Sequence, residues 1–171
     1  TVIAVALAHY CYLTVRYLPP FFEHKSRIVY GEGEEVKNNQ DIRHPSVRGC
    51  LDYLKISKGV EIHHDGDLPA RSGLGSSSSF TVGLLHALYS YVGQKASPDR
   101  LAREACEIEI DILKEPIGKQ DQYAVAYGGL NIMRFLPEGE VKVEPIKMES
   151  EVYKNLQENL LLFYTGISRS A

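Results

Sequence analysis

The amino-acid sequence predicts an α+β domain, and three observations lead to this prediction. Strand-like and helix-like patterns follow one another in mixed order, without the regular β-α-β alternation that builds a doubly wound parallel sheet. The length of 171 residues suits one domain, with enough chain to bury a core. No internal repeat is visible, and 44% apolar with 24% charged residues argues against disorder, collagen-like repeats and coiled coils.

The first part of the chain predicts strands around one helix. Residues 2–8 and 10–17 are rich in β-branched and aromatic side chains, which favours strands, and two prolines then end regular pairing. Apolar residues recur at i, i+3, i+4 and i+7 from Val47, which predicts an amphipathic helix that ends before Gly59. We also expect a short strand over 27–30, a polar surface loop over 32–40 and a strand over 60–63.

The second part predicts two longer helices before further strands. Residues 80–92 are apolar almost all round the helical wheel, so we expect a buried helix that stops at Gly93. Ser97 and Pro98 supply an N-cap and a first-turn proline for a helix that runs to about residue 113. The remaining expectations are a helical turn within 118–127, a hairpin of 130–136 and 141–146, a polar helix near 151–159 and a last strand over 160–164.

Composition argues against several classes of function. A net charge of −3 with scattered Lys and Arg lacks the basic stripe that nucleic-acid binding needs, and it does not suggest a membrane-surface protein. The apolar opening lacks a basic segment and is shorter than the roughly 20 residues of a membrane span. Three widely spaced cysteines form neither a disulfide framework nor a zinc motif, which favours a reducing, cytoplasmic location.

A Gly/Ser run over residues 73–79 is the first candidate site. Its composition alone is typical of a flexible linker. However, a strongly apolar helix follows without a break, and a glycine-rich turn at a helix N-terminus presents free N–H groups to an anion. We therefore favour a phosphate-binding loop. No lysine follows Gly75 as in a P-loop, and Ser78 stands where the dinucleotide-binding pattern needs its third glycine.

Two carboxylates are further candidates. Glu109 falls inside the apolar arc of the helix after Pro98, so it is either part of a structural ion pair or a site residue. Asp121 is either an N-cap for a short helix or a site residue. The neighbouring His63 and His64 face opposite ways on a strand, so we do not expect them to form a metal pair.

These motifs together resemble one known family. The run Pro69-Ala-Arg-Ser-Gly-Leu-Gly-Ser-Ser-Ser-Ser79 resembles the central ATP-binding motif of the GHMP kinases, P-x-x-x-G-L-G-S-S-A-A. Glu109 resembles the helix glutamate of that family, and Gly118-Lys-Gln-Asp-Gln-Tyr123 resembles its G-x-x-D-Q-[FY] segment. The serines at 78 and 79 are most similar to the D-glycero-D-manno-heptose 7-phosphate kinase branch.

The resemblance implies a ribosomal protein S5 domain 2-like fold for residues 1–171, as the N-terminal, ATP-binding domain of such a kinase. It implies ATP and Mg²⁺ as cofactors, with Ser77 and Glu109 holding the metal and Asp121 orienting or deprotonating the attacking sugar hydroxyl. The residues implied to bind ATP are Pro69, Gly73, Leu74, Gly75, Ser76, Ser77 and Ser78.

The implied activity is transfer of the γ-phosphoryl group of ATP to a sugar or sugar phosphate, foremost the anomeric hydroxyl of a heptose 7-phosphate in nucleotide-sugar or surface-polysaccharide synthesis. Alternatives are a kinase for fucose, galactose or a uronic acid, or a non-catalytic nucleotide-binding module. A homodimer is left open. Thr165, Ser168 and Arg169 lie where related kinases approach the substrate. The family's first and third motifs are missing, so we expect an N-terminally trimmed domain without its C-terminal partner, inactive on its own.

Overall fold

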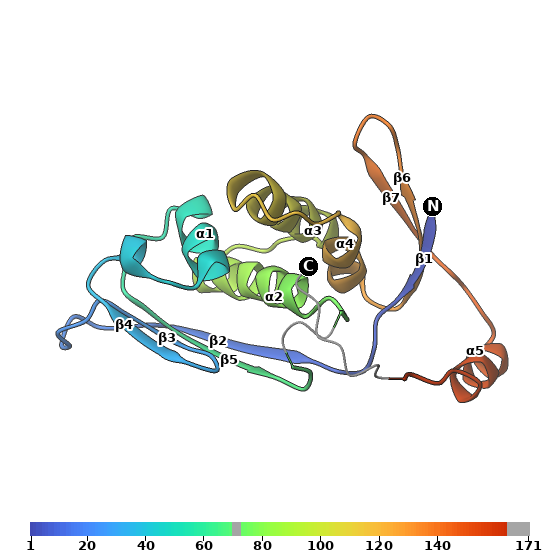
Figure 1. Ribbon diagram of the computed structural model, residues 1–171, viewed down its shortest axis with the longest axis horizontal. Coiled ribbons are helices and arrows are strands. Elements are labelled where there is room, and N and C mark those ends of the chain that lie inside the picture. The colour runs from blue at the N-terminus through green and yellow to red at the C-terminus, as the bar shows by residue number, and fades with distance from the viewer. Residues whose placement is uncertain (70–72, 164–171) are drawn as a thin grey trace.

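The computed structural model describes residues 1–69 and 73–163. Its main body is a four-stranded sheet with a layer of helices over one face (Figure 1). The strands of this sheet, in spatial order, are β2 (Cys11–Tyr17), β5 (Val60–Gly66), β3 (Ser26–Val29) and β4 (Gly33–Val36). The helices are α1 (Pro45–Tyr53), α2 (Ser76–Tyr91), α3 (Pro98–Cys106) and α4 (Gln120–Tyr127). The predicted α+β class is confirmed.

The sheet separates an apolar face from a charged face, because side chains alternate along each strand. β5 pairs antiparallel with β2 and parallel with β3. Ile62 on β5 is fully buried under the helices. Its neighbour Glu61 points to the other face, where it pairs with Arg16 and with His63, whose Nε2 lies 2.7 Å from Glu61 Oε1. The helices therefore cover the Ile62 face only.

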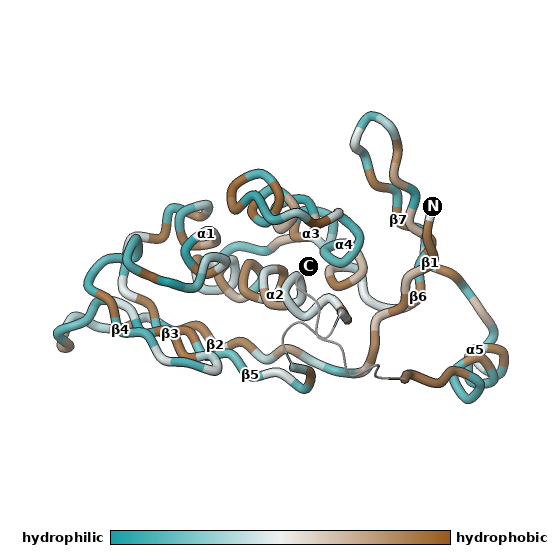
Figure 2. Tube along the Cα trace, viewed as in Figure 1, coloured by the Kyte–Doolittle hydropathy of each residue, from teal (hydrophilic) through white to brown (hydrophobic). Residues whose placement is uncertain are grey.

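The helix α2 is the centre of the core, as its apolar sequence predicts. Leu84, Leu85 and Leu88 are fully buried between the sheet and the other helices. Gly83 lets the helix approach the sheet closely, since a Cβ atom built there would lie 2.9 Å from Leu13 Cδ1. Apolar colour runs along this helix in Figure 2. The close packing of α2 on the sheet sets the position of the helix N-terminus.

A second, smaller sheet packs beside the helical layer. It consists of β1 (Val2–Val5), β6 (Leu130–Phe135) and β7 (Val141–Pro145), all antiparallel in the order β1-β6-β7. Met133 and Val141 form a separate core with Tyr123 of α4. The predicted hairpin is thus confirmed. α5 (Ser150–Glu158) extends away from the main body, and none of its residues is buried (Figure 1).

Two expectations about regular structure were wrong. The predicted surface loop over 32–40 contains β4 and a short 3-10 helix, η1 (Asn39–Asp41). The polar sequence did not predict this strand, because the one buried side chain of β4 is Glu34, whose carboxylate accepts hydrogen bonds. The predicted strand over 160–164 is absent from residues 160–163, which form no regular element, and residue 164 lies outside the described residues.

The helix predicted from Pro98 to about residue 113 changes character midway. After α3 the chain forms a π-helical turn, η2 (Glu107–Ile112), closed by a bond from the Leu113 N–H to the Ile108 carbonyl. A wider turn rotates the following side chains away from their α-helical positions. Ile112 would share the apolar face of Ile108 in a continuous α-helix, but it is 49% exposed. Ile108 and Glu109 stay buried. Within residues 1–69 and 73–163, none of the helices is long and apolar enough to cross a bilayer.

Candidate phosphate-binding and catalytic site

The glycine-rich turn before α2 has the features of an anion-binding site. Gly73 and Gly75 have φ angles of +76° and +73°, which glycine adopts without a steric penalty. Gly75 is the N-cap of α2, so no side chain caps the helix, and no acidic residue occupies the first turn. The first N–H groups of a helix have no acceptor within it, and they lie at the positive end of its dipole. This arrangement fits the phosphates of a nucleotide.

The serines that open α2 differ in their surroundings. Ser77 is exposed in the first turn of the helix. Ser78 is only 3% exposed and points inward, where its Oγ donates a hydrogen bond to Glu109 Oε2 at 2.9 Å. The Ser78 hydroxyl is thus used inside the protein, and its backbone N–H remains at the phosphate-binding turn. Leu74 is exposed between the two glycines.

Glu109 is a buried carboxylate held by three neutral donors. It is 1% exposed. Its Oε1 accepts from Thr81 Oγ1 at 2.7 Å, and its Oε2 accepts from Ser78 Oγ and from Gln122 Nε2 at 2.5 Å. The sequence left two interpretations of Glu109 open, a structural ion pair or a site residue. Within residues 1–69 and 73–163, Glu109 forms no ion pair with a cation. The carboxylate instead joins η2 to the first turn of α2 and to α4.

Asp121 lies directly against the phosphate-binding turn. It is the second residue of α4, whose N-cap is Lys119, so it is not an N-cap aspartate. A Cβ atom built on Gly75 would lie 3.3 Å from Asp121 Cγ. Asp121 is exposed, and its carboxyl group lies beside the turn. The fold thus brings together two residues 46 positions apart in the sequence.

The residues present fit a nucleotide with a divalent cation. Mg²⁺ prefers oxygen ligands and commonly binds one or two carboxylates together with phosphate and water. Asp121, Glu109 and the exposed Ser77 hydroxyl supply such oxygens around the α2 N-terminus. In the part of the chain that the structure describes, no cluster of three or more His, Cys, Asp or Glu side chains forms a metal site by itself. A metal here would share its ligands with the phosphates.

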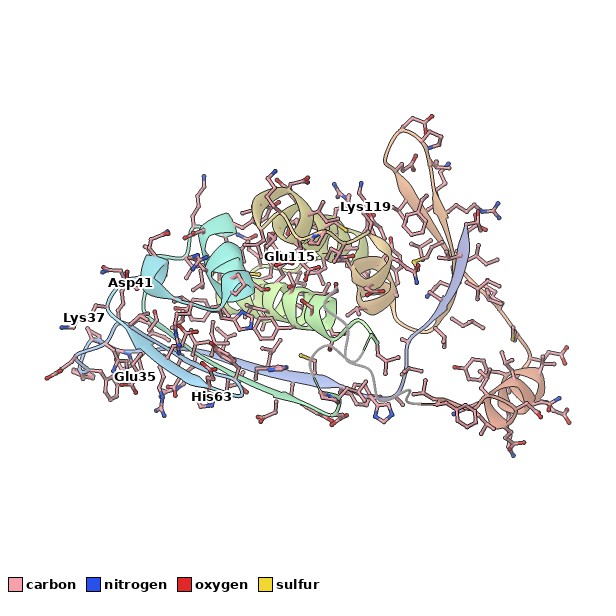
Figure 3. The ribbon with its side chains drawn as sticks, in the orientation of Figure 1. Glu35, Lys37, Asp41, His63, Glu115 and Lys119 are labelled. Atoms are coloured by element: carbon pink, nitrogen blue, oxygen red, sulfur yellow. The ribbon has the colours of Figure 1, made fainter. Side chains whose placement is uncertain are left out.

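The other predicted positions have mixed outcomes. Pro69 is the last described residue before residues 70–72. Thr165, Ser168 and Arg169 lie outside the described residues. His63 projects from the sheet face remote from the helices, as Figure 3 shows, whereas the His64 ring packs edge-on against Phe80 with centroids 5.0 Å apart.

Two partners of Glu109 were missed from the sequence. Thr81 lies three residues after Ser78 on α2, so both hydroxyls lie on one face of the helix. The spacing of Ser78 and Thr81 could therefore have indicated two hydroxyl donors on the same face of the helix. Gln122 follows Asp121 directly, and nothing in a single sequence shows which way its amide points.

The chain belongs to the GHMP kinase family: residues 45–129 match the family model described as the GHMP kinases N terminal domain. It is 33% identical over 120 residues to a D-glycero-alpha-D-manno-heptose 7-phosphate kinase of Campylobacter jejuni. This match covers 70% of this chain and 35% of that enzyme. It is 35% identical over 128 residues to a galactokinase of Pyrococcus furiosus, covering 72% of this chain and 34% of that enzyme.

A solved structure supports the same assignment. The crystal structure of a D-glycero-D-manno-heptose 1-phosphate kinase from Bacteriodes thetaiotaomicron superposes with a TM-score of 0.78 at 28% sequence identity. The match covers 87% of this chain and 52% of that one. The expected GHMP kinase N-terminal fold is thereby confirmed. The chain spans about a third of the length of the two enzymes named above and about half of this solved chain.

Proposed function

We propose that this chain is the ATP-binding part of a kinase that transfers the γ-phosphoryl group of ATP to a hydroxyl group of a sugar or sugar phosphate. The observation that carries the proposal is the contact between Asp121 and Gly75. It sets an exposed carboxylate beside an uncapped helix N-terminus that fits phosphate. Phosphoryl transfer needs chiefly positioning and charge neutralisation, and this arrangement supplies them in part.

In this proposal residues 73–78 hold the phosphates with backbone N–H groups, and Asp121 orients the acceptor hydroxyl or takes its proton. Ser77 and Glu109 are the proposed Mg²⁺ ligands, and the metal would neutralise charge on the phosphates. Glu109 accepts three hydrogen bonds, and a carboxylate has about four lone-pair positions, so it retains room for one further contact.

We further propose a heptose 7-phosphate as the substrate, phosphorylated at its anomeric hydroxyl on a route to nucleotide sugars or surface polysaccharides. The names of the Campylobacter jejuni and Bacteriodes thetaiotaomicron relatives support a heptose phosphate. The similarity to a galactokinase supports a simple hexose as the second candidate. A panel of heptose phosphates, galactose, fucose and uronic acids with labelled ATP separates these substrates.

A second domain would complete the active site. The match covers 35% of the heptose 7-phosphate kinase and 52% of the solved chain, which supports a further domain in the parent protein. We expect residues 1–171 alone to show little or no transfer. Measurable ATP-dependent phosphorylation of a sugar phosphate by this stretch would contradict that expectation.

The test of Asp121 uses the full-length protein. We expect Asp121→Asn to lower kcat by about 100-fold or more, because general-base and positioning groups contribute about 10²–10⁴ to the rate. ATP affinity, measured by calorimetry, should stay within a few-fold. Asp111→Asn, an exposed acid on η2, is the matched control and should be silent. Unchanged turnover in Asp121→Asn would remove Asp121 from the mechanism, and ATP binding without transfer to any sugar would favour the non-catalytic module.

A further inference from the structure

The buried hydrogen bonds around Glu109 join three elements at one point. Ser78 and Thr81 donate from α2, Gln122 donates from α4, and Glu109 itself lies on η2. All four side chains are buried. Hydrogen bonds to a charged acceptor are stronger than those between neutral groups, so this contact resists small rotations of the helices that meet there.

Gln122 is a poor choice for packing alone. It is 0% exposed, and its Nε2 donates to Glu109 Oε2 at 2.5 Å. Its Oε1 is buried and has no hydrogen-bond partner among residues 1–69 and 73–163. A buried polar atom without a partner destabilises a protein by about 1–3 kcal/mol. An apolar residue of the same length would avoid that penalty. The contribution of Gln122 is therefore the hydrogen bond that its amide donates to Glu109.

The neighbour of Gln122 is the candidate catalytic residue. Successive residues of an α-helix point about 100° apart. Gln122 therefore points inward to Glu109, while Asp121 lies against the turn at Gly75. The rotation of α4 about its axis decides whether both contacts can exist together. Tyr123 anchors α4 in the second core, and Val125 and Ala126 of the same helix pack against the main core, so the polar contact at Glu109 acts together with this apolar packing.

We propose that Gln122 is a positioning residue for phosphoryl transfer: through Glu109 it fixes the rotation of α4 relative to α2, which keeps the Asp121 carboxylate against the phosphate-binding turn. The inference rests on the proposed function of Asp121. It assigns to Glu109 a task in addition to any contact with a metal, since the carboxylate connects the helix that binds phosphate with the helix that carries Asp121.

The first experiment compares Gln122→Met with Thr81→Val in the full-length protein. Each variant removes one donor to Glu109 and nearly keeps the side-chain volume, but only Gln122 belongs to the helix of Asp121. We expect Gln122→Met to lower kcat about 10- to 100-fold, the effect of a misplacement near 1 Å. The KM for ATP should change less than about threefold, and Thr81→Val should lower kcat less. Equal losses in both variants would overturn the inference.

The second experiment asks whether Gln122 acts through Asp121. Gln122→Met in an Asp121→Asn background should change the residual kcat less than about threefold, because residues that act as a unit are non-additive. The same loss in both backgrounds would contradict the proposal. Gln122→Asn keeps the amide but withdraws it from Glu109, so it should show the same loss of kcat. This variant replaces Gln122→Met in the experiment if Gln122→Met does not fold. Gln157→Glu on the exposed α5 controls for a change of glutamine as such.

A third readout does not depend on activity. Native-state hydrogen exchange of the α4 amides should accelerate in Gln122→Met and stay unchanged in Thr81→Val, because exchange reports local opening. Unchanged exchange in α4 would overturn the positioning role even in an active enzyme. If the wild-type protein phosphorylates no sugar, the proposed function fails, whereas this exchange experiment still decides whether Gln122 fixes α4.

Discussion

At the scale of single residues, two glycines shape the phosphate-binding turn in different ways. Both have φ near +75°, a conformation that side chains rarely adopt. Among residues 1–69 and 73–163, a Cβ atom on Gly73 would meet nothing within 4 Å, whereas one on Gly75 would lie 3.3 Å from the Asp121 carboxyl carbon. The backbone conformation thus favours glycine at both positions, and the close approach of Asp121 is a second reason for glycine at position 75.

This difference predicts distinct effects of Gly75→Ala and Gly73→Ala. Both should lower the free energy of unfolding by about 1–2 kcal/mol, the penalty of a left-handed conformation. Only Gly75→Ala displaces Asp121, so it should show the larger loss of kcat. Denaturant unfolding and steady-state kinetics of the two variants measure the effects separately. Equal kcat values would show that the contact at Gly75 does not matter for catalysis.

At the scale of elements, the entry to α1 depends on a carboxylate from β4. Glu34 is 4% exposed and accepts hydrogen bonds from the Tyr30 hydroxyl and from the backbone N–H groups of Arg43 and His44. Burial raises the pKa of Glu34, but these donors outweigh it and hold the pKa below its usual value. The donors therefore stabilise the ionised form in the folded protein.

We expect acid to weaken this junction. Because the folded-state pKa of Glu34 is lowered, its contribution to stability is present above the unfolded-state pKa of about 4.3 and is lost as pH falls through the folded value. Glu34→Gln should lower the free energy of unfolding at pH 7 by about 1–3 kcal/mol, since an amide N–H₂ would face N–H donors. The loss should shrink toward pH 3 in denaturant titrations. Glu35→Gln, an exposed neighbour with surface ion pairs, should change stability little.

At the scale of the whole molecule, the packing of α2 on the sheet places the site. The helix crosses β2 where Gly83 faces Leu13, and this close approach brings the two layers together. The second sheet rests on α4 through Tyr123 and Met133. α4, which carries Asp121, also packs against the main core through Val125 and Ala126, and Glu109 adds hydrogen bonds that link this helix to α2.

The layer packing predicts a coupled pair of substitutions. Gly83→Val overpacks the contact with Leu13 and should lower the free energy of unfolding by about 1–3 kcal/mol. In the double variant with Leu13→Ala, part of this loss should be recovered, with a coupling energy of about 0.5–3 kcal/mol in a thermal or denaturant cycle. Gly31→Val, where a Cβ meets nothing within 4 Å, is the control. Strict additivity would mean that Gly83 and Leu13 do not define the layer contact.

Apolar patterning was enough to predict most of the elements. The apolar run of α2, the cap and proline of α3 and the hairpin of β6 and β7 are local features, so the sequence alone predicts them. β4 and the π turn escaped prediction because they depend on tertiary contacts. The burial of Glu34 depends on donors from Tyr30, Arg43 and His44, which reach it only in the folded chain. The exposure of Ile112 follows from a turn that α-helical periodicity does not describe.

For the site, the sequence by itself determined the family resemblance, the phosphate-binding turn and the two candidate carboxylates, because motif residues and their spacing are visible along the chain. Only the tertiary structure decided what each carboxylate does in the fold. It set Asp121 against Gly75, buried Glu109 among three donors and turned Gln122 inward. The physical reason is that side-chain direction and burial depend on the packing of α2, η2 and α4 against one another, and no local pattern encodes that packing.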